Sequence, residues 1–252
     1  MKRSLLGMLA LALVGALAAC SDSTSPEVEF ASCNGSQPSD FFQSPSVDEP
    51  QANLFFINAA PQYGGVNLCV DSWEAWTGQP NSSDYSRVYM KSSSIPHTLV
   101  VTTIGDEAVL ASTKVTFKVD TQYMAVFAQR GADSRLIVLP DTVSAPPSGQ
   151  ALLRLVNVRP DVGAVDVYKT TGTTDLTGLT PVVSNLAFGA VSRYVSYTSD
   201  PTRIIVTAVG DPSTVLHDSG TFTDPAGQVW TGLLMYDNGA PLPWVQWILD
   251  RH

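Results

Sequence analysis

The sequence predicts an all-β fold, organised as two tandem Ig-like antiparallel β-sandwich domains. From residue 52 onward, short runs rich in Val, Ile, Leu, Thr and Tyr recur between Gly, Pro, Asn and Asp. Several runs alternate polar and apolar residues, as Lys114 and Thr116 alternate with Val115 and Phe117. This is the period of two that marks a strand, and no stretch of twelve residues has helical periodicity. Many short strands with regular turns are typical of sandwiches and barrels.

Residues 1–19 read as a secretory signal. Lys2 and Arg3 precede thirteen uncharged residues, Leu5–Leu17, which fall short of the roughly 20 apolar residues that span a bilayer but fit the core of a signal peptide. The residues 17–20, Leu-Ala-Ala-Cys, resemble the lipobox of bacterial lipoproteins. We therefore expect Cys20 to carry the lipid that attaches the mature protein to the membrane, since several acyl chains anchor stably. Ser21 follows it, where Asp would favour the inner membrane, so we expect the outer membrane of the cell envelope.

Residues 20–51 are rich in Ser, Pro and acidic residues, which predicts a flexible or disordered tether. Phe41 and Phe42 are its candidates for packing onto the domain that follows. Once Cys20 is lipidated, Cys33 and Cys69 remain, and an even remainder in an exported protein permits a disulfide. Sequence spacing does not establish the geometry that a disulfide needs, so the pairing stays open here.

An internal repeat divides the remainder into predicted domains at 52–141 and 151–252, joined by a Pro- and Ser-rich linker. Without a gap, Asn58 aligns with Asn157, Pro61 with Pro160, Gly64 with Gly163 and Val66 with Val165. Further along, Ser86-Arg87 aligns with Ser192-Arg193, and Gly105-Asp106 with Gly210-Asp211. Matches in the same order across both halves indicate two copies of one supersecondary plan.

Three segments of the second half carry a family resemblance: LRLVNVRPDVGAVDVYKT, VVSNLAFGAVSRYVSY and RIIVTAVGDPSTVL. They resemble the bacterial domain-of-unknown-function family 4397. Residues 151–251 match well, and residues 52–139 resemble a diverged copy with Gln62 in place of Asp161 and Asn67 in place of Asp166. The resemblance implies exported β-sandwich modules, often in tandem. It implies no catalytic residues, because the family has no established activity.

Charge excludes one class of partner. The chain carries 14 basic and 23 acidic residues, and removal of Lys2 and Arg3 leaves 12 basic residues and a net charge of −11. Nucleic-acid binding depends on Lys and Arg contacts to phosphate, so we expect no nucleic-acid partner. Acidity of this kind favours solubility outside the cytoplasm.

Catalytic and metal motifs are scarce, and we expect neither an enzyme nor a cofactor. His97, His217 and His252 have no partner at metal-ligand spacing, and no CxxC or GxSxG motif occurs. A hydrolase with an unrecognised site stays open, because a triad is assembled in space rather than in sequence. Asp161 and Asp166 flank a turn and are weak candidates for Ca²⁺, although Asp is also a common turn former.

Aromatic residues offer the other route to a function. Trp73 and Trp76, with Tyr85 nearby, fall in a polar insertion of the first repeat, where exposed rings stack on sugars or contact a protein partner. The alternative is that these rings cover a local core. We therefore expect a non-catalytic binding or scaffold module, with a glycan or an envelope protein as the candidate partner and a carbohydrate-binding module as the sharper alternative.

Overall fold

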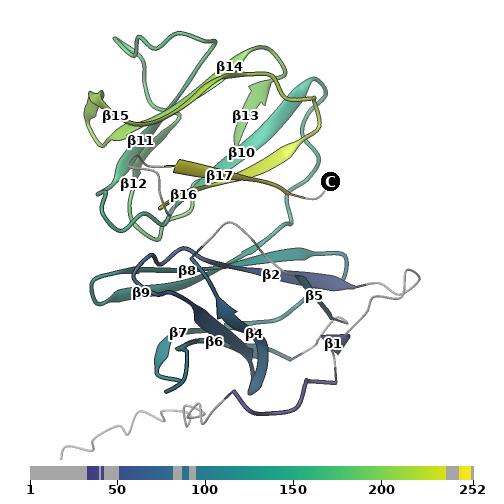
Figure 1. Cartoon of the computed structure of the whole chain (residues 1–252). Helices are drawn as coiled ribbons and strands as arrows, with labels where there is room; N and C mark the ends of the chain where they lie inside the picture. The colour runs from purple at the N-terminus through teal and green to yellow at the C-terminus, as the bar shows by residue number, and fades with distance from the viewer. Residues whose placement is uncertain are drawn as a thin grey trace, which may run out of the picture. The chain divides into compact units, whose positions relative to one another are not determined.

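The structure is a computed structural model that describes residues 33–39, 41–42, 51–81, 87–90, 95–236 and 244–250. The predicted signal, Cys20, Tyr85 and His252 lie outside this part of the chain. The described residues form strands β1 to β17 and no helix, and none of their segments is a helix that could cross a membrane. The strands form two sandwich-like groups (Figure 1), which confirms the all-β sandwich prediction. The domain boundaries at 52–141 and 151–252 stay a prediction.

The first sandwich consists of a five-stranded and a four-stranded sheet. The five-stranded sheet has the order β1-β5-β2-β8-β9, and the four-stranded sheet has the order β4-β3-β6-β7. The buried faces of both sheets meet in one core that includes Leu54, Phe56, Leu68, Val101 and Phe127. The bounds are β1 Phe41–Phe42, β2 Ala52–Asn58, β3 Val66–Val70, β4 Trp73–Gln79, β5 Arg87–Met90, β6 His97–Thr103, β7 Val109–Val115, β8 Gln122–Arg130 and β9 Asp133–Pro140.

The second sandwich has two four-stranded sheets, β13-β10-β16-β17 and β12-β11-β14-β15. Its core includes Leu153, Leu155, Val167, Val206 and Leu234. The bounds are β10 Gln150–Asn157, β11 Val165–Thr170, β12 Val183–Leu186, β13 Val195–Thr198, β14 Thr202–Ala208, β15 Asp211–Phe222, β16 Val229–Met235 and β17 Trp244–Leu249.

The two sandwiches share one plan of strand pairing. Apart from β1, each strand of the first has a counterpart at the same sheet position in the second, so that β2 corresponds to β10 and β8 to β16. The pairing differs from the antiparallel prediction at one place in each sandwich, because β2 pairs with β8, and β10 with β16, in parallel. The chain crosses from one sheet to the other between these strands, so they need not be antiparallel neighbours.

A buried asparagine joins the two sheets of each sandwich. Asn58 and Asn157 are fully buried. The side-chain amide of Asn58 donates to the carbonyl of Gln79 at 3.1 Å, and that of Asn157 donates to the carbonyl of Leu186 at 3.0 Å. Their carbonyl oxygens accept the backbone N–H two residues ahead, at Ala60 and Arg159. The aligned asparagines of the repeat therefore have the same structural role.

A second hydrogen bond between side chain and backbone is also equivalent in the two sandwiches. Asn67 Oδ1 accepts the N–H of Gly78, and Asp166 Oδ1 accepts the N–H of Asn185, both at 2.8 Å. Gly78 and Asn185 have φ values of 62° and 53°, in the left-handed region that glycine and asparagine tolerate best. The pair Asn67 and Asp166 thus fixes an irregular strand end in each copy.

Residues 33–39 and 41–42, which lie within the predicted tether and are called the leader below, pack against the first sandwich. Cys33 forms a disulfide with Cys69 of β3, with Cα atoms 5.7 Å apart. Asn34 then forms an isolated β-bridge with Trp73 of β4, and Phe41 of β1 pairs with Met90 of β5. The Phe41 ring is buried and packs on Trp73, His97 and Phe117. Part of the segment predicted as tether therefore closes one side of the first sandwich.

A third apolar cluster connects the outer faces of the sheets that contain β2 and β10. From the first sandwich it includes Phe55, Ile57 and Met124, and from the second it includes Val156 and Leu233. Arg154 adds a hydrogen bond from its guanidinium to the carbonyl of Pro140 at 3.4 Å. Both sandwiches therefore share buried surface, although their sequence suggests separate modules.

We predict that Asn157→Ala destabilises the protein by about 2–4 kcal/mol, because it leaves the Leu186 carbonyl and the Arg159 N–H buried without a partner, each at a cost of about 1–3 kcal/mol. Urea unfolding followed by circular dichroism measures the change. Lys114→Ala, at an exposed position, is the control and should change the free energy of unfolding by less than about 0.5 kcal/mol. Equal stability of the two variants would contradict the role given to Asn157.

Candidate ligand pocket

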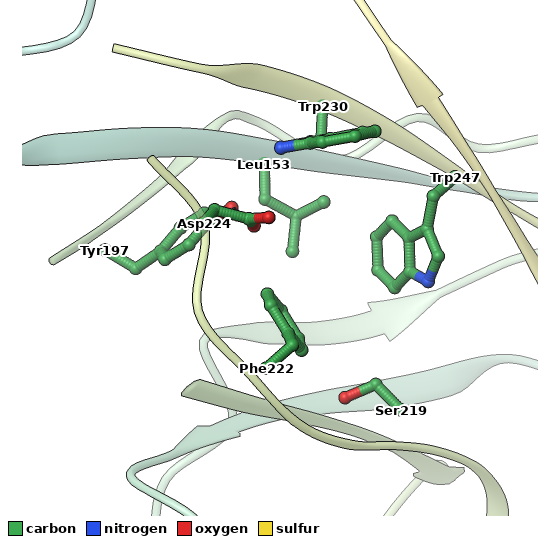
Figure 2. Close-up of a pocket in the computed structure, with 7 residues that line it drawn as sticks. All are labelled: Leu153, Tyr197, Ser219, Phe222, Asp224, Trp230 and Trp247. Atoms are coloured by element: carbon green, nitrogen blue, oxygen red, sulfur yellow. The ribbon is translucent and has the colours of Figure 1, made fainter. Parts of the chain in front are cut away.

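A pocket of about 270 Å³ lies between the two sheets of the second sandwich. Strands β10, β13, β16 and β17 contribute Leu153, Tyr197, Trp230 and Trp247, and β15 contributes Ser219 and Phe222. Asp224 comes from the connection between β15 and β16. Figure 2 shows the rings of Trp230, Trp247, Phe222 and Tyr197 around a common space. The lining is mostly apolar with few polar groups, as is usual for ligand sites.

One core side chain of the first sandwich has no apolar counterpart at the pocket of the second. The registers of β6 with β7, and of β14 with β15, align Val115 with Phe222, and therefore Phe117 with Asp224. Phe117 is fully buried and packs edge-on against Tyr123, with ring centroids 4.9 Å apart. Asp224 is polar and only half-buried, so the space that an aromatic ring would fill stays open.

Tyr197 holds the carboxylate of Asp224 at the edge of the pocket. The Tyr197 hydroxyl donates to Asp224 Oδ2 at 2.5 Å. Burial, this hydrogen bond and the negative charge of Asp224 all raise the pKa of Tyr197, with burial the largest cause. The phenol therefore remains protonated, and the carboxylate retains lone pairs that can accept hydrogen bonds from the hydroxyl groups of a ligand.

Trp230 adds a donor to the same end of the pocket. Its indole Nε1 is buried and has no hydrogen-bond partner among the described residues. In Figure 2 this nitrogen lies at the end of the ring that faces the side of Asp224 and Tyr197. A buried N–H without a partner is costly, so a ligand oxygen at this position would be stabilised.

Glycine 232 makes room for the second tryptophan. Gly232 of β16 lies opposite Trp247 of β17. A Cβ atom on Gly232 would lie 2.7 Å from Cζ3 of Trp247 and 2.9 Å from Cγ1 of Val245, closer than side chains can pack. The aligned position in the first sandwich is Ala125, opposite Val138. The larger ring of Trp247 therefore depends on the missing side chain beside it.

The equivalent position in the first sandwich has a different chemistry. A pocket of about 370 Å³ there includes Val115, Tyr123 and Val138, which align with Phe222, Trp230 and Trp247 in strand register. The remainder of its lining is Thr113, Lys114, Thr116, Lys118, Pro140 and Thr142. The aromatic walls and the carboxylate are therefore particular to the second sandwich.

The aromatic residues singled out from the sequence are not brought together as an exposed surface. Trp76 is buried and packs on Phe56, with ring centroids 6.0 Å apart. Trp73 is half-buried against Phe41 at 5.2 Å. The segment predicted as a loop forms β4, so these rings belong to the core of the first sandwich, and Tyr85 lies outside the described residues.

Asp161 and Asp166 each have a structural partner. Both carboxylate oxygens of Asp161 accept from the Arg159 guanidinium, and this ion pair lowers the pKa of Asp161. Asp166 accepts from the N–H groups of Asn185 and Gly210 at 2.8 Å. Within the described residues no group of His, Cys, Asp or Glu is arranged to hold a metal ion.

The histidines are placed separately. His97 is buried at the start of β6 and contacts Asp71 at 2.8 Å. His217 lies in β15, where it pairs with Val206. His252 lies outside the described residues. Neither described histidine lines the pocket of the second sandwich.

The pocket residues themselves were not identified from the sequence. Trp230 and Trp247 fall in apolar runs typical of strands, and neither Asp224 nor Tyr197 stands in a recognisable motif. The signal that could have found them is the aligned repeat, in which Phe117 of the first copy becomes Asp224 of the second. That alignment depends on strand register, because the two copies differ in length between β14 and β16.

The fold is that of an all-β protein with two sandwich-like groups, the second of which has an aromatic-lined pocket. Residues 52–168 match the model of the family "Domain of unknown function (DUF4397)", which confirms the resemblance to this family seen in the sequence. The match covers the first sandwich from β2 and continues through β10 into β11. The sequence predicts the stronger resemblance in residues 151–251, whereas the matched stretch is mainly the first copy.

Solved structures similar to this chain include two kinds of carbohydrate-binding module. A family CBM26 module from Eubacterium rectale Amy13K in complex with maltoheptaose has 9% identity and a TM-score of 0.26, covering 80% of this chain and 98% of that chain. A structure of α-glucan recognition by family 41 modules from streptococcal virulence factors has 11% identity and a TM-score of 0.26, covering 72% and 92%. Such low scores carry no conclusion about ligand or activity. No curated protein matches the chain in sequence.

We predict that Tyr197 makes stability depend on pH in the alkaline range. Its pKa is raised in the folded state, so its contribution is fully present below the unfolded value near 10 and is lost as the pH rises further. The free energy of unfolding should therefore fall between about pH 10 and 12, and less steeply in Tyr197→Phe. Urea unfolding at several pH values measures both slopes, and parallel curves would contradict the prediction.

Proposed function

We propose that this protein is a non-catalytic carbohydrate-binding protein of the cell envelope, with its binding site in the second sandwich. The observation that carries the proposal is the pocket whose walls include Trp230 and Trp247 and whose polar end holds Asp224. Flat aromatic rings pack against the apolar C–H face of a sugar ring. The carboxylate of Asp224 accepts hydrogen bonds from sugar hydroxyl groups, and the indole N–H of Trp230 donates a hydrogen bond to a sugar oxygen.

The size of the pocket favours a small part of a glycan rather than a long segment. About 270 Å³ is slightly below the usual range for small-molecule sites of about 300–1,000 Å³. We therefore infer that one or two sugar units enter the pocket and that any longer chain continues over the surface. Because the site has both stacking faces and hydrogen-bonding groups, neutral sugars suit it better than purely apolar molecules.

The same lining argues against glycoside hydrolysis. Most glycosidases use two carboxyl groups, about 5–10 Å apart, on opposite sides of the scissile bond. Asp224 is the single carboxylate among the described lining residues. Tyr197 donates to it, and the raised pKa of Tyr197 keeps the phenol from acting as a base near neutral pH. Binding is therefore the function that this arrangement supports.

The proposed location rests on the sequence. The signal-like residues 1–19 and the lipobox-like residues before Cys20 predict a lipid anchor. The acidic balance of the chain suits an extracytoplasmic surface. With such an anchor, the second sandwich would present a glycan-binding site at the envelope, and we propose the outer membrane as its membrane.

We predict that the chain from Ser21 to His252 binds soluble oligosaccharides and that Trp247→Ala weakens this binding at least tenfold, because one aromatic wall is removed. Isothermal titration calorimetry with maltoheptaose and cellohexaose, one α-linked and one β-linked glucan, measures the affinity. A change in tryptophan fluorescence should accompany binding, since Trp230 and Trp247 line the pocket.

Two variants control this experiment. Lys114→Ala, in the aligned pocket of the first sandwich, should bind as the unchanged chain does. Gly232→Ala should weaken binding without removing an aromatic ring, because the added Cβ displaces Trp247. An unchanged affinity in Trp247→Ala would show that sugars bind elsewhere, and no affinity of the unchanged chain for a broad panel of glycans would refute the proposal.

A further inference from the structure

One side of the second sandwich is open where the same side of the first is closed by the leader. In the first sandwich, residues 33–39 and 41–42 extend from β4, where Asn34 bridges Trp73, to β5, where Phe41 pairs with Met90. In the second sandwich the corresponding strands are β12 and β13. Among the described residues no strand pairs with the outer edge of β13.

The described residues just before β10 do not supply a closing strand there. They belong to β9 and to the linker, and β9 is already paired with β8 in the first sandwich. The linker ends in a turn at which the N–H of Gln150 donates to the carbonyl of Pro147. In the part of the chain that the structure describes, the second copy therefore has no segment that corresponds to β1.

A groove of about 490 Å³ lies beside β12, next to the segment that leads into β13. Its walls are β12 with the residues just before it, Pro181–Leu186, and the segment Ala190–Arg193 that leads into β13. The segment is held to β10, because the N–H of Ser192 donates to the carbonyl of Leu155. Val191 and Arg193 are exposed there, so the groove offers both apolar contact and a positive charge.

The edge of β13 presents backbone groups beside the groove. In an antiparallel pair, hydrogen-bonded and non-hydrogen-bonded residue pairs alternate. Ser199 N donates to the carbonyl of Gly149, so Tyr197 opposite Ala151 is a hydrogen-bonded pair, and Ser196 directs its N–H and C=O away from β10. Ser196 corresponds in register to Tyr89, which in the first sandwich pairs with Phe42 of β1.

We propose that the β12–β13 side of the second sandwich binds an extended peptide segment of a partner protein. The segment pairs antiparallel with Ser196 and Tyr197 and places an aromatic side chain next to Tyr197. Strand addition of this kind takes its affinity from backbone hydrogen bonds and its specificity from side-chain contacts. The chemistry of the segment follows from β1, in which Phe41 lies opposite Met90, the counterpart of Tyr197 in strand register.

The strand-addition site and the carbohydrate pocket share Tyr197, which lines the pocket and belongs to the strand with which the segment pairs. Peptide binding and sugar binding are measured with different ligands. Ser196 does not line the pocket, so substitutions at Ser196 test strand addition without altering a pocket side chain, and the two proposals can fail independently.

The test uses the peptide QPSDFFQS, residues 37–44 of this chain, labelled with fluorescein and added to the chain from Ser21 to His252. Fluorescence anisotropy should show saturable binding, and a peptide with Ala in place of Phe41 should bind at least tenfold more weakly. Absence of binding, or equal binding of the two peptides, would overturn the proposal.

A matched pair of variants locates the site. Ser196→Pro removes the outward N–H that strand addition needs, whereas Ser196→Ala retains it and loses only the side-chain hydrogen bond to Gln150. Peptide affinity should fall at least tenfold in Ser196→Pro relative to Ser196→Ala, with sugar binding equal in both. Equal peptide affinity would overturn the proposal.

Hydrogen exchange gives a readout that does not depend on the folding of a variant. Addition of QPSDFFQS to the unchanged chain should slow exchange at the amides of Ser196 and Thr198, and unaltered rates would contradict strand addition. Self-association of the chain without added peptide, abolished by Ser196→Pro, would identify a second copy as the occupant and would overturn the proposal of a separate partner.

Discussion

The buried asparagine amide is the constraint on which both sandwiches depend. A side chain with donors and an acceptor is placed at the end of β2 and of β10, in surroundings that exclude water. It satisfies a carbonyl on the opposite sheet and an N–H of its own turn at once. Because an unsatisfied polar group in such a place is costly, the strand end, the turn and the opposite sheet must form together. The rest of each core is ordinary apolar packing around this fixed point.

Within that common frame, function is determined by how the space between the sheets is filled. The first sandwich fills it with Phe117 and with the Phe41 ring of the leader. The second has Asp224 in place of Phe117 and no leader, and it gains large indoles where the first has Tyr123 and Val138. Duplication therefore supplied one copy whose core is filled by aromatic rings and another in which aromatic rings and a carboxylate line a pocket.

The sequence predicts those features of the structure that depend on neighbouring residues and misses those that depend on contacts between distant strands. Strand content, the repeat and the aligned Asn58 and Asn157 were predictable, because alternation and turn residues are local. The aromatic site was not, since the sequence drew attention to Trp73 and Trp76, which lie in a run of Ser, Gly and Asn but form a buried strand. Trp230, Trp247 and Asp224 come together only through strand register, which single-sequence patterns do not determine. The disulfide was left open for the same reason.

The covalent link between Cys33 and Cys69 has a mechanical consequence. Within the described residues, tension that reaches Cys33 passes through the disulfide to Cys69, in an inner strand of its sheet. The two-residue strand β1 lies beyond Cys33 along the chain and is relieved of that load. A protein held by its N-terminus in a moving envelope would thus resist peeling, because tension is taken up by a bond that joins the leader to the centre of the sandwich.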